Sequence, residues 1–182
     1  MSTAYEGYEA LRVAVSGGVA RVIIDHPPIN LFDLTLMREV ARIGRELEAD
    51  DAVRVIVFSS ANPEFFIAHA DVAAILELPV EAPREVAEPS GFQRMTERYR
   101  RMEKASIAVI EGCVRGGGSE FVLALDMRFA ARGRAVFGQP EVAIGILPGG
   151  SGTQRLPRLM GRGRALEVIL GCDNYDAEIA ER

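Results

Sequence analysis

The first apolar positions of the chain alternate in two short runs that predict a β-hairpin. The runs extend from Leu11 to Val15 and from Val19 to Asp25, and Gly17-Gly18 lies between them. Two glycines between alternating runs are typical of a tight hairpin turn. Pro27-Pro28 then ends the hairpin.

A helical period follows the hairpin. Apolar residues recur at helical spacing from an N-cap at Asp33 or Thr35 to about Ala49, namely Leu36, Met37, Val40, Ile43 and Leu47. Val53 to Phe58 is then a short apolar run that predicts a buried strand. The resulting β-α-β order favours a parallel sheet.

The second half of the chain repeats this alternation of short strands and helices. Residues 79–91 are rich in Pro, Glu and Ala and predict a mobile loop. The elements expected after it are a helix at 92–104, strands at Ile107–Ile110, Asp126–Ala130 and Val136–Phe137, helices at about 151–160 and 162–170, and the first turns of a helix at Asp176–Arg182. That ending suggests a truncated polypeptide or a sequence recorded only in part.

Length and charge narrow the class of protein. A chain of 182 residues with 48% hydrophobic content suffices for one α/β domain over residues 1–182 and leaves little room for a second. The net charge of −5 argues against a nucleic-acid binder. One basic stripe stands out, at Arg94, Arg98, Arg100, Arg101 and Lys104; it is either a solvated helix face or a contact for an anionic ligand.

The cysteines and the N-terminus give no sign of secretion or of a metal site. Cys113 and Cys172 fit neither a disulfide framework nor a zinc-ligand spacing. The start of the chain is too polar for a signal peptide, and no apolar run reaches membrane-spanning length. We therefore expect a cytoplasmic protein.

Three consecutive glycines, Gly116 to Gly118, separate an apolar strand from a helix in the segment IAVIEGCVRGGGSE. Without β-carbons, they allow a substrate to approach the main chain, and the backbone N–H groups can bind an anionic oxygen. The same glycines also suit a plain strand-to-helix turn. Neither a P-loop nor a dinucleotide-binding spacing is present.

Two carboxylates accompany the glycines. Glu120 lies where it either complements the helix dipole or moves protons beside a pocket. Glu141 interrupts an apolar run, and we expect burial among Val142, Ala143, Ile144 and Leu147 to raise its pKa. Two such carboxylates also suit a glycosidase, but a glycine turn that stabilises negative charge favours an oxyanion.

A third segment, NPEFFIAHADVAAI, ends an apolar strand at Ala68 and continues through His69, Ala70 and Asp71 into a short helix. The first N–H groups there can supply a second donor facing the glycine turn. Asp71 is expected to hold this loop.

Four motifs together resemble the enoyl-CoA hydratase/isomerase, or crotonase, superfamily from about residue 8 to the end of the chain. They are HPPINLF, FFIAHAD, AVIEGCVRGGGSEFVLALD and FGQPEVAIGILPGGSGTQRLPR, in the family's order. The resemblance implies a β-β-α spiral core that binds an acyl-CoA thioester, with its oxygen held by the N–H groups of Ala70 and Gly117. It also implies CoA or substrate contacts at Pro28, Ile29, Leu31, Ala68, His69, Asp71 and Gly116.

The reaction implied by the resemblance is hydration of a trans-2-enoyl-CoA to a 3-hydroxyacyl-CoA. Glu120 would act mainly as base on the water, and Glu141 would protonate Cα. No metal or redox cofactor is implied. The family forms trimers or dimers of trimers through a C-terminal helical region, most of which this chain lacks.

Other outcomes remain open: Δ3-Δ2 isomerisation, thioester hydrolysis, decarboxylation, or acyl-CoA binding without catalysis. His69 is the main departure, because the family usually has glycine there. It would narrow the oxyanion hole, change the backbone at Ala70, add an imidazole to the site, or simply pack in the turn. Pro28 replaces a common basic residue, and His26 and Asp126 are expected to be structural.

Overall fold

Two β-sheets and the helices around them form the structure, a computed structural model that describes residues 5–77 and 88–182. The loop expected at 79–91 lies, up to residue 87, outside the described residues. The strands are β1 Leu11–Ser16, β2 Val19–Ile24, β3 Val55–Ser60, β4 Phe65–Ile67, β5 Ala105–Ile110, β6 Cys113–Arg115, β7 Met127–Ala130, β8 Val136–Gly138 and β9 Asn174–Asp176. The helices are α1 Leu34–Ala49, α2 Val72–Leu76, α3 Gly91–Arg101, α4 Gly117–Val122, the 3-10 helix η1 Glu141–Ile144, α5 Gly152–Gly171 and α6 Ala177–Glu181.

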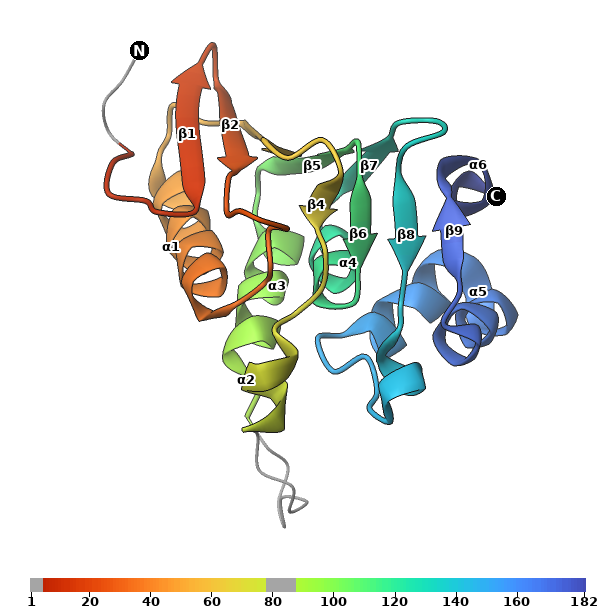
Figure 1. Cartoon of the computed structure of the whole chain (residues 1–182). Helices are drawn as coiled ribbons and strands as arrows, with labels where there is room; N and C mark the ends of the chain where they lie inside the picture. Colours follow the sequence, from red (N-terminus) through yellow and green to blue (C-terminus); the bar gives the residue numbers. More distant parts are fainter. Residues whose placement is uncertain (1–4, 78–87) are drawn as a thin grey trace.

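Successive turns of the chain place one strand in each sheet and then a helix. The first sheet has the order β1-β2-β3-β5-β7 and the second β4-β6-β8-β9 (Figure 1). The β1–β2 and β8–β9 pairs are antiparallel, and all other pairs are parallel. The repeated β-β-α unit confirms the expected spiral fold.

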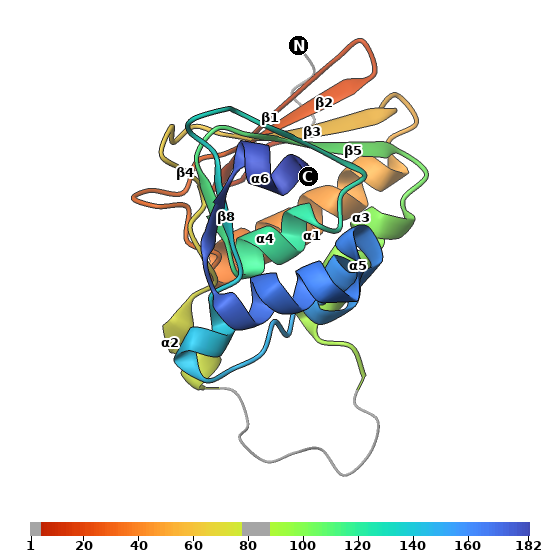
Figure 2. The same cartoon turned by 90° about the vertical axis from the view of Figure 1, so that its right-hand side faces the viewer.

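An aromatic cluster fills the space between the sheets and the helices. Figure 2 shows α1, α3 and α4 beneath the first sheet and beside the second. The cluster packs edge to face with ring centroids 5.1–5.9 Å apart and consists of Phe32, Phe58, Phe92, Tyr99 and Phe121. Such pairs add about 1 kcal/mol each beyond area burial. Phe32 and Phe121 adjoin the segments that carry the site, so core packing fixes the site directly.

The predicted elements are largely confirmed, with differences at their ends. The N-cap of α1 is Asp33, whose side chain accepts a hydrogen bond from Leu36 N. The two helices expected near 151–170 meet at Gly161, whose φ of 79° and ψ of 162° interrupt α5. The helix α3 ends three residues before the expected position 104, and β6 and β9 were not anticipated. Strands of three residues carry too few alternations to be recognised.

The basic stripe is a set of partnered side chains. Arg98 pairs with Glu48, and both Arg100 and Arg101 pair with Glu97. Arg94 donates to the Pro89 carbonyl, and Lys104 donates to the Leu47 carbonyl at the end of α1. The interpretation as a structural, partly solvated helix face fits these contacts.

Candidate active site

The glycine turn directs one backbone N–H outward from the start of α4. Gly116 has φ 53° and ψ −127°, a left-handed conformation that favours glycine. Its N–H donates to Gly138 O at 3.1 Å, and its carbonyl accepts from Glu120 N at 2.9 Å. Because the Gly116 carbonyl points into the helix, the Gly117 N–H of the same peptide points the opposite way. Within residues 5–77 and 88–182 this N–H donates no hydrogen bond.

The loop after β4 presents a second N–H, that of Ala70. Phe32 N donates to His69 O at 2.9 Å, and Asp71 N donates to Phe32 O at 3.2 Å. This clamp holds the His69 carbonyl, so the Ala70 N–H faces away from Phe32. It finds no acceptor in the described part of the chain.

The two donors lie beside each other. A β-carbon added at Gly117 would lie 3.0 Å from Ala70 Cβ and 3.8 Å from Ala70 N. Only a small residue at position 117 permits this approach. The structure therefore brings together the two N–H groups expected from the sequence, and neither has an acceptor among the residues that the structure describes.

His69 and Asp71 frame the Ala70 donor. The Ala70 carbonyl is 2.8 Å from His69 Nδ1; because a carbonyl only accepts, Nδ1 carries the proton. His69 Cβ is 3.8 Å from the position that a Gly116 β-carbon would occupy, so the half-buried imidazole borders the site. Asp71 caps α2 by accepting from Ala73 N at 2.9 Å.

Glu120 is buried in α4 and is held by the start of α5. The residue is 4% exposed, and its Oε1 accepts from Gly152 N at 2.7 Å. A β-carbon at Gly150 would lie 2.5 Å from Oε2, so the main chain closes over the carboxylate. Burial is the main cause that raises the pKa of Glu120 to about 7, and the charge of Glu141 adds to it. The Gly152 and Gly150 N–H groups and Arg155 oppose this rise.

Glu141 begins η1 and contacts the glycine turn. It is 8% exposed, and its Oε2 accepts from Gln139 Nε2 at 3.0 Å. Its Oε1 lies 3.0 Å from where a Gly116 β-carbon would be. Burial raises the pKa of Glu141, against the effects of its own backbone N–H and of Gln139. The expected direction is confirmed.

The expected cause of that burial was wrong. The apolar neighbours named from the sequence, Val142, Ala143, Ile144 and Leu147, are all exposed. A 3-10 helix has three residues per turn, so the residues next to Glu141 point away from it. Gly116 and Gln139 enclose the carboxylate instead.

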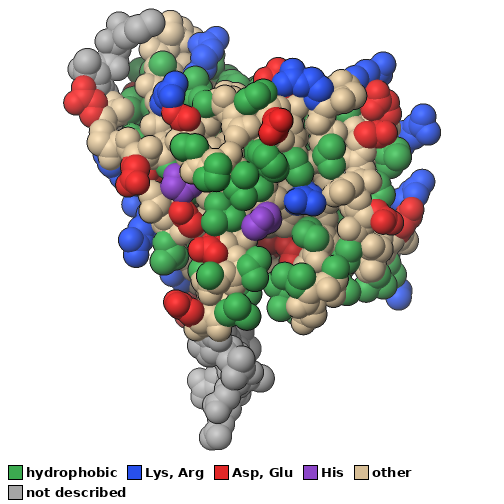
Figure 3. Space-filling view, in the orientation of Figure 1, with side chains coloured by type: hydrophobic (Ala, Val, Ile, Leu, Met, Phe, Trp, Pro, Cys, Tyr) green, Lys and Arg blue, Asp and Glu red, His purple; other side chains and the backbone are tan. Residues whose placement is uncertain are grey.

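The two segments expected to contact CoA lie side by side. Ala68 N donates to Ile29 O at 3.3 Å, while Pro28 is exposed and Ile29 and Leu31 are half-buried. Asn30, which the sequence did not single out, joins them: its Nδ2 donates to the Phe65 and Phe66 carbonyls at 3.1 Å. The face that carries β4 has hydrophobic side chains near its centre (Figure 3).

Two residues expected to be structural make structural contacts. His26 Nε2 lies 2.8 Å from Asp33 Oδ2, at the start of α1. Asp126 Oδ2 accepts from both the backbone N–H and the hydroxyl of Ser106, at 2.7 and 2.9 Å. Neither contact reaches the carboxylate pair.

Gln139, Gly152 and Arg155 belong to the site and escaped the sequence reasoning. All three lie within the FGQPEVAIGILPGGSGTQRLPR motif. The length of this motif was the one signal in the sequence that residues beyond Glu141 belong to the site. Gln139 contacts Glu141 two positions away, and Gly152 contacts Glu120 32 positions away, a contact that only the fold defines. Arg155 contacts Thr96 and Glu97 of α3.

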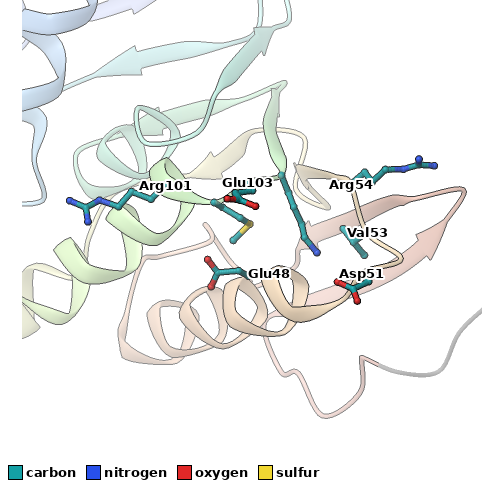
Figure 4. A pocket seen from close by; sticks show the side chains of 8 residues that line it. Glu48, Asp51, Val53, Arg54, Arg101 and Glu103 are labelled. Carbon is teal, nitrogen blue, oxygen red and sulfur yellow. The ribbon is translucent and has the colours of Figure 1, made fainter.

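A surface hollow lies elsewhere. It has a volume of about 670 Å³, lies at the amino ends of β3 and β5 (Figure 4), and is lined by Glu48, Asp51, Val53, Arg54, Arg101, Met102, Glu103 and Lys104. Glu48 pairs with Arg98 and Arg101 pairs with Glu97, while Lys104 donates to the Leu47 carbonyl at the end of α1. It contains neither of the buried carboxylates.

Residues 5–77 and 88–182 contain no cluster of three His, Cys, Asp or Glu side chains arranged to hold a metal ion. Among the helices that the structure describes, none is both long and apolar enough to cross a membrane.

Comparisons with known proteins point to one family. A sequence model described as Enoyl-CoA hydratase/isomerase matches residues 14–182. A short-chain-enoyl-CoA hydratase from Clostridium acetobutylicum is 35% identical over 167 residues, 91% of this chain and 63% of that protein. A crotonyl-CoA hydratase from Syntrophomonas wolfei is 34% identical over 176 residues, 96% of this chain and 66% of that protein. The chain thus spans under two thirds of the length of these relatives.

Solved structures share the fold. A structure from Streptomyces avermitilis has a TM-score of 0.84 and 48% identity, and the match covers 96% of this chain and 65% of that one. An enoyl-CoA hydratase from Bacillus anthracis has a TM-score of 0.84 and 30% identity, with 95% and 67% covered.

Proposed function

This chain belongs to the enoyl-CoA hydratase/isomerase family, and on that premise we propose that it hydrates a trans-2-enoyl-CoA to a 3-hydroxyacyl-CoA. The observation that carries the proposal is the convergence of two N–H donors, at Ala70 and Gly117, with two buried carboxylates; neither donor has an acceptor in the described part of the chain. Coenzyme A enters as part of the substrate, and the reaction uses no further cofactor.

The oxyanion donors act on the thioester. As water adds at Cβ, charge develops on the thioester oxygen, and both N–H groups hydrogen-bond the resulting enolate. Their positions are fixed beforehand by Phe32 and by the glycine turn, so little reorganisation is needed. Loss of one such donor typically costs about 3 kcal/mol.

The carboxylates move the protons. Glu120, as a carboxylate, takes a proton from water while the hydroxyl adds to Cβ, and protonated Glu141 gives a proton to Cα as the enolate collapses. Return of one proton from Glu120 to Glu141 restores the starting state. The pKa of about 7 leaves Glu120 partly ionised at neutral pH, as an acid-base catalyst requires.

The names of the relatives support an enoyl-CoA as the substrate class. Both curated relatives are named as hydratases of enoyl-CoA or crotonyl-CoA. We extend this by proposing a cytoplasmic enzyme that assembles as a trimer or a dimer of trimers and binds CoA along Pro28, Ile29, Leu31 and the Ala68–Asp71 loop.

The ultraviolet absorbance of the conjugated enoyl thioester gives the test. Addition of the chain to crotonyl-CoA should remove this absorbance and yield 3-hydroxybutyryl-CoA, identified by mass spectrometry. A panel of short, medium and aromatic enoyl-CoAs would then define the acyl group. Binding of CoA esters without turnover of any member would contradict the proposal.

His69 favours one second candidate. An imidazole bordering the Ala70 donor, where relatives of this family usually have glycine, suits another enolate reaction such as isomerisation, hydrolysis or decarboxylation. If the chain catalyses one of these reactions and does not hydrate any enoyl-CoA, this second function is the correct one.

A further inference from the structure

The side chain of His69 bonds to the main chain of the oxyanion loop. His69 lies where the chain passes from β4 into α2 (Figure 1). Its Nδ1 donates to the Ala70 carbonyl at 2.8 Å. Within residues 5–77 and 88–182 no backbone N–H donates to that carbonyl. The imidazole therefore restrains the peptide that follows Ala70, and a glycine at position 69 would have no side chain to do so.

Ala70 is restrained on both sides. The peptide before it carries the Ala70 N–H, and Phe32 N holds this peptide by donating to His69 O at 2.9 Å. The peptide after it is held by the long bond from Asp71 N to Phe32 O, at 3.2 Å, and by the shorter bond from His69. Phe32 is fully buried in the aromatic cluster, so its main chain is a firm support. Because both peptides are planar, these contacts together set the direction of the Ala70 N–H.

The spacing of the two oxyanion donors depends on Ala70. The Gly117 N–H is fixed independently, by the hydrogen bonds of Gly116 to Gly138 and Glu120. Ala70 Cβ lies only 3.0 Å from where a Gly117 β-carbon would be. A rotation of the backbone at Ala70 therefore changes the angle between the two N–H groups. Stabilisation of an oxyanion requires both donors to aim at one oxygen.

We propose that His69 is a positioning residue, which fixes the Ala70 N–H of the oxyanion hole through the hydrogen bond from Nδ1 to the Ala70 carbonyl. The proposal rests on the proposed function, in which this N–H binds the thioester oxygen. It requires no proton transfer by the imidazole. The restraint belongs to the Nδ1–H group and not to the bulk of the ring.

Three substitutions separate the hydrogen bond from the bulk of the ring. His69→Ala removes the donor, His69→Gln moves an amide donor one carbon further from the backbone, and His69→Asn places an amide donor near the position of Nδ1. The first two should lower kcat on crotonyl-CoA about fivefold, the equivalent of one hydrogen bond. His69→Asn should recover most of this loss. KM should change less, because charge develops on the thioester oxygen only in the transition state.

NMR spectroscopy of the 182-residue chain gives readouts that need no turnover. The chain has two histidines, His26 and His69, so the ring signals that His69→Ala removes are assigned at once. The nitrogen chemical shifts of the His69 ring should show the proton on Nδ1. Hydrogen exchange at the Asp71 amide should be about fivefold faster in His69→Ala and His69→Gln and should slow again in His69→Asn. The amides of β3 report opening of the whole fold and should exchange as in the parent.

The outcomes distinguish this role from the proposed function. Faster exchange at Asp71 with no turnover of any enoyl-CoA would refute the hydratase function and retain the restraint by His69. Turnover with equal kcat in His69→Ala and His69→Asn would overturn the role of His69 and retain the function. Unchanged exchange at Asp71, or a His69 ring protonated at Nε2 alone, would overturn the role whatever the rate. If His69→Ala does not fold, His69→Gln and His69→Asn still differ in the place of one donor.

Discussion

The two halves of the site hold their carboxylates in different ways. Glu120 is held by the backbone N–H of Gly152 at 2.7 Å, beside a cation and next to the aromatic core. Glu141 is held by the side chain of Gln139 at 3.0 Å and is followed by an exposed 3-10 helix. Both are buried, but only Glu120 has its pKa raised to about 7. The two environments therefore raise the pKa values of the pair to different extents.

The largest expected effect is loss of either carboxylate. Glu120→Gln and Glu141→Gln keep the size of the side chain and an oxygen that can accept from Gly152 or Gln139. Each should lower kcat by about 10²–10⁴-fold, because acid-base catalysis contributes that much. Steady-state hydration of crotonyl-CoA measures this effect. An unchanged rate in either variant would remove that residue from the mechanism.

Loss of one oxyanion donor should be nearly as severe. Gly117→Pro removes the N–H at the first position of α4, where proline is tolerated, and should lower kcat by about 10²–10³-fold. Gly117→Ala is the matched control, because it adds the same β-carbon near Ala70 and keeps the donor. Equal losses in the two variants would mean that crowding, not hydrogen bonding, is responsible.

A smaller effect should follow from removing the support of Glu141. Gln139→Met keeps the length of the side chain and removes the donor to the carboxylate, so the pKa of Glu141 should rise further and kcat/KM should fall about tenfold. The pH profile would record both changes. If Gln139→Met had the same rate and pH profile as the parent, the hydrogen bond from Gln139 to Glu141 would not contribute to catalysis.

The fold was largely predictable because its longer elements carry clear periods. The helix α1 and the β1–β2 hairpin follow directly from hydrophobic spacing and from the Asp33 cap. The strands β6 and β9, with three residues each, depend on pairing with β8 and leave no period in the sequence. The spiral order itself came from the family motifs and not from periodicity.

The site was predictable in its chemical groups and not in their surroundings. The motifs predicted the N–H donors at Ala70 and Gly117 and the two carboxylates, and the structure brings the two donors together. The enclosure of Glu141 was misjudged, because a 3-10 helix turns its neighbours outward. The contact from Gly152 to Glu120 spans 32 positions, and long-range contacts of backbone atoms have no sequence signature.

The central claim is that burial raises the pKa of Glu120 to about 7. The free energy of unfolding as a function of pH, compared between the parent chain and Glu120→Gln, tests this claim most directly. Because the folded pKa of about 7 exceeds the ordinary 4.5, the folded state binds the proton more tightly. This contribution is fully present below pH 4.5 and is lost as the pH rises to about 7. The parent should therefore lose about 3 kcal/mol relative to Glu120→Gln across that window. A difference that stays constant with pH would contradict the account.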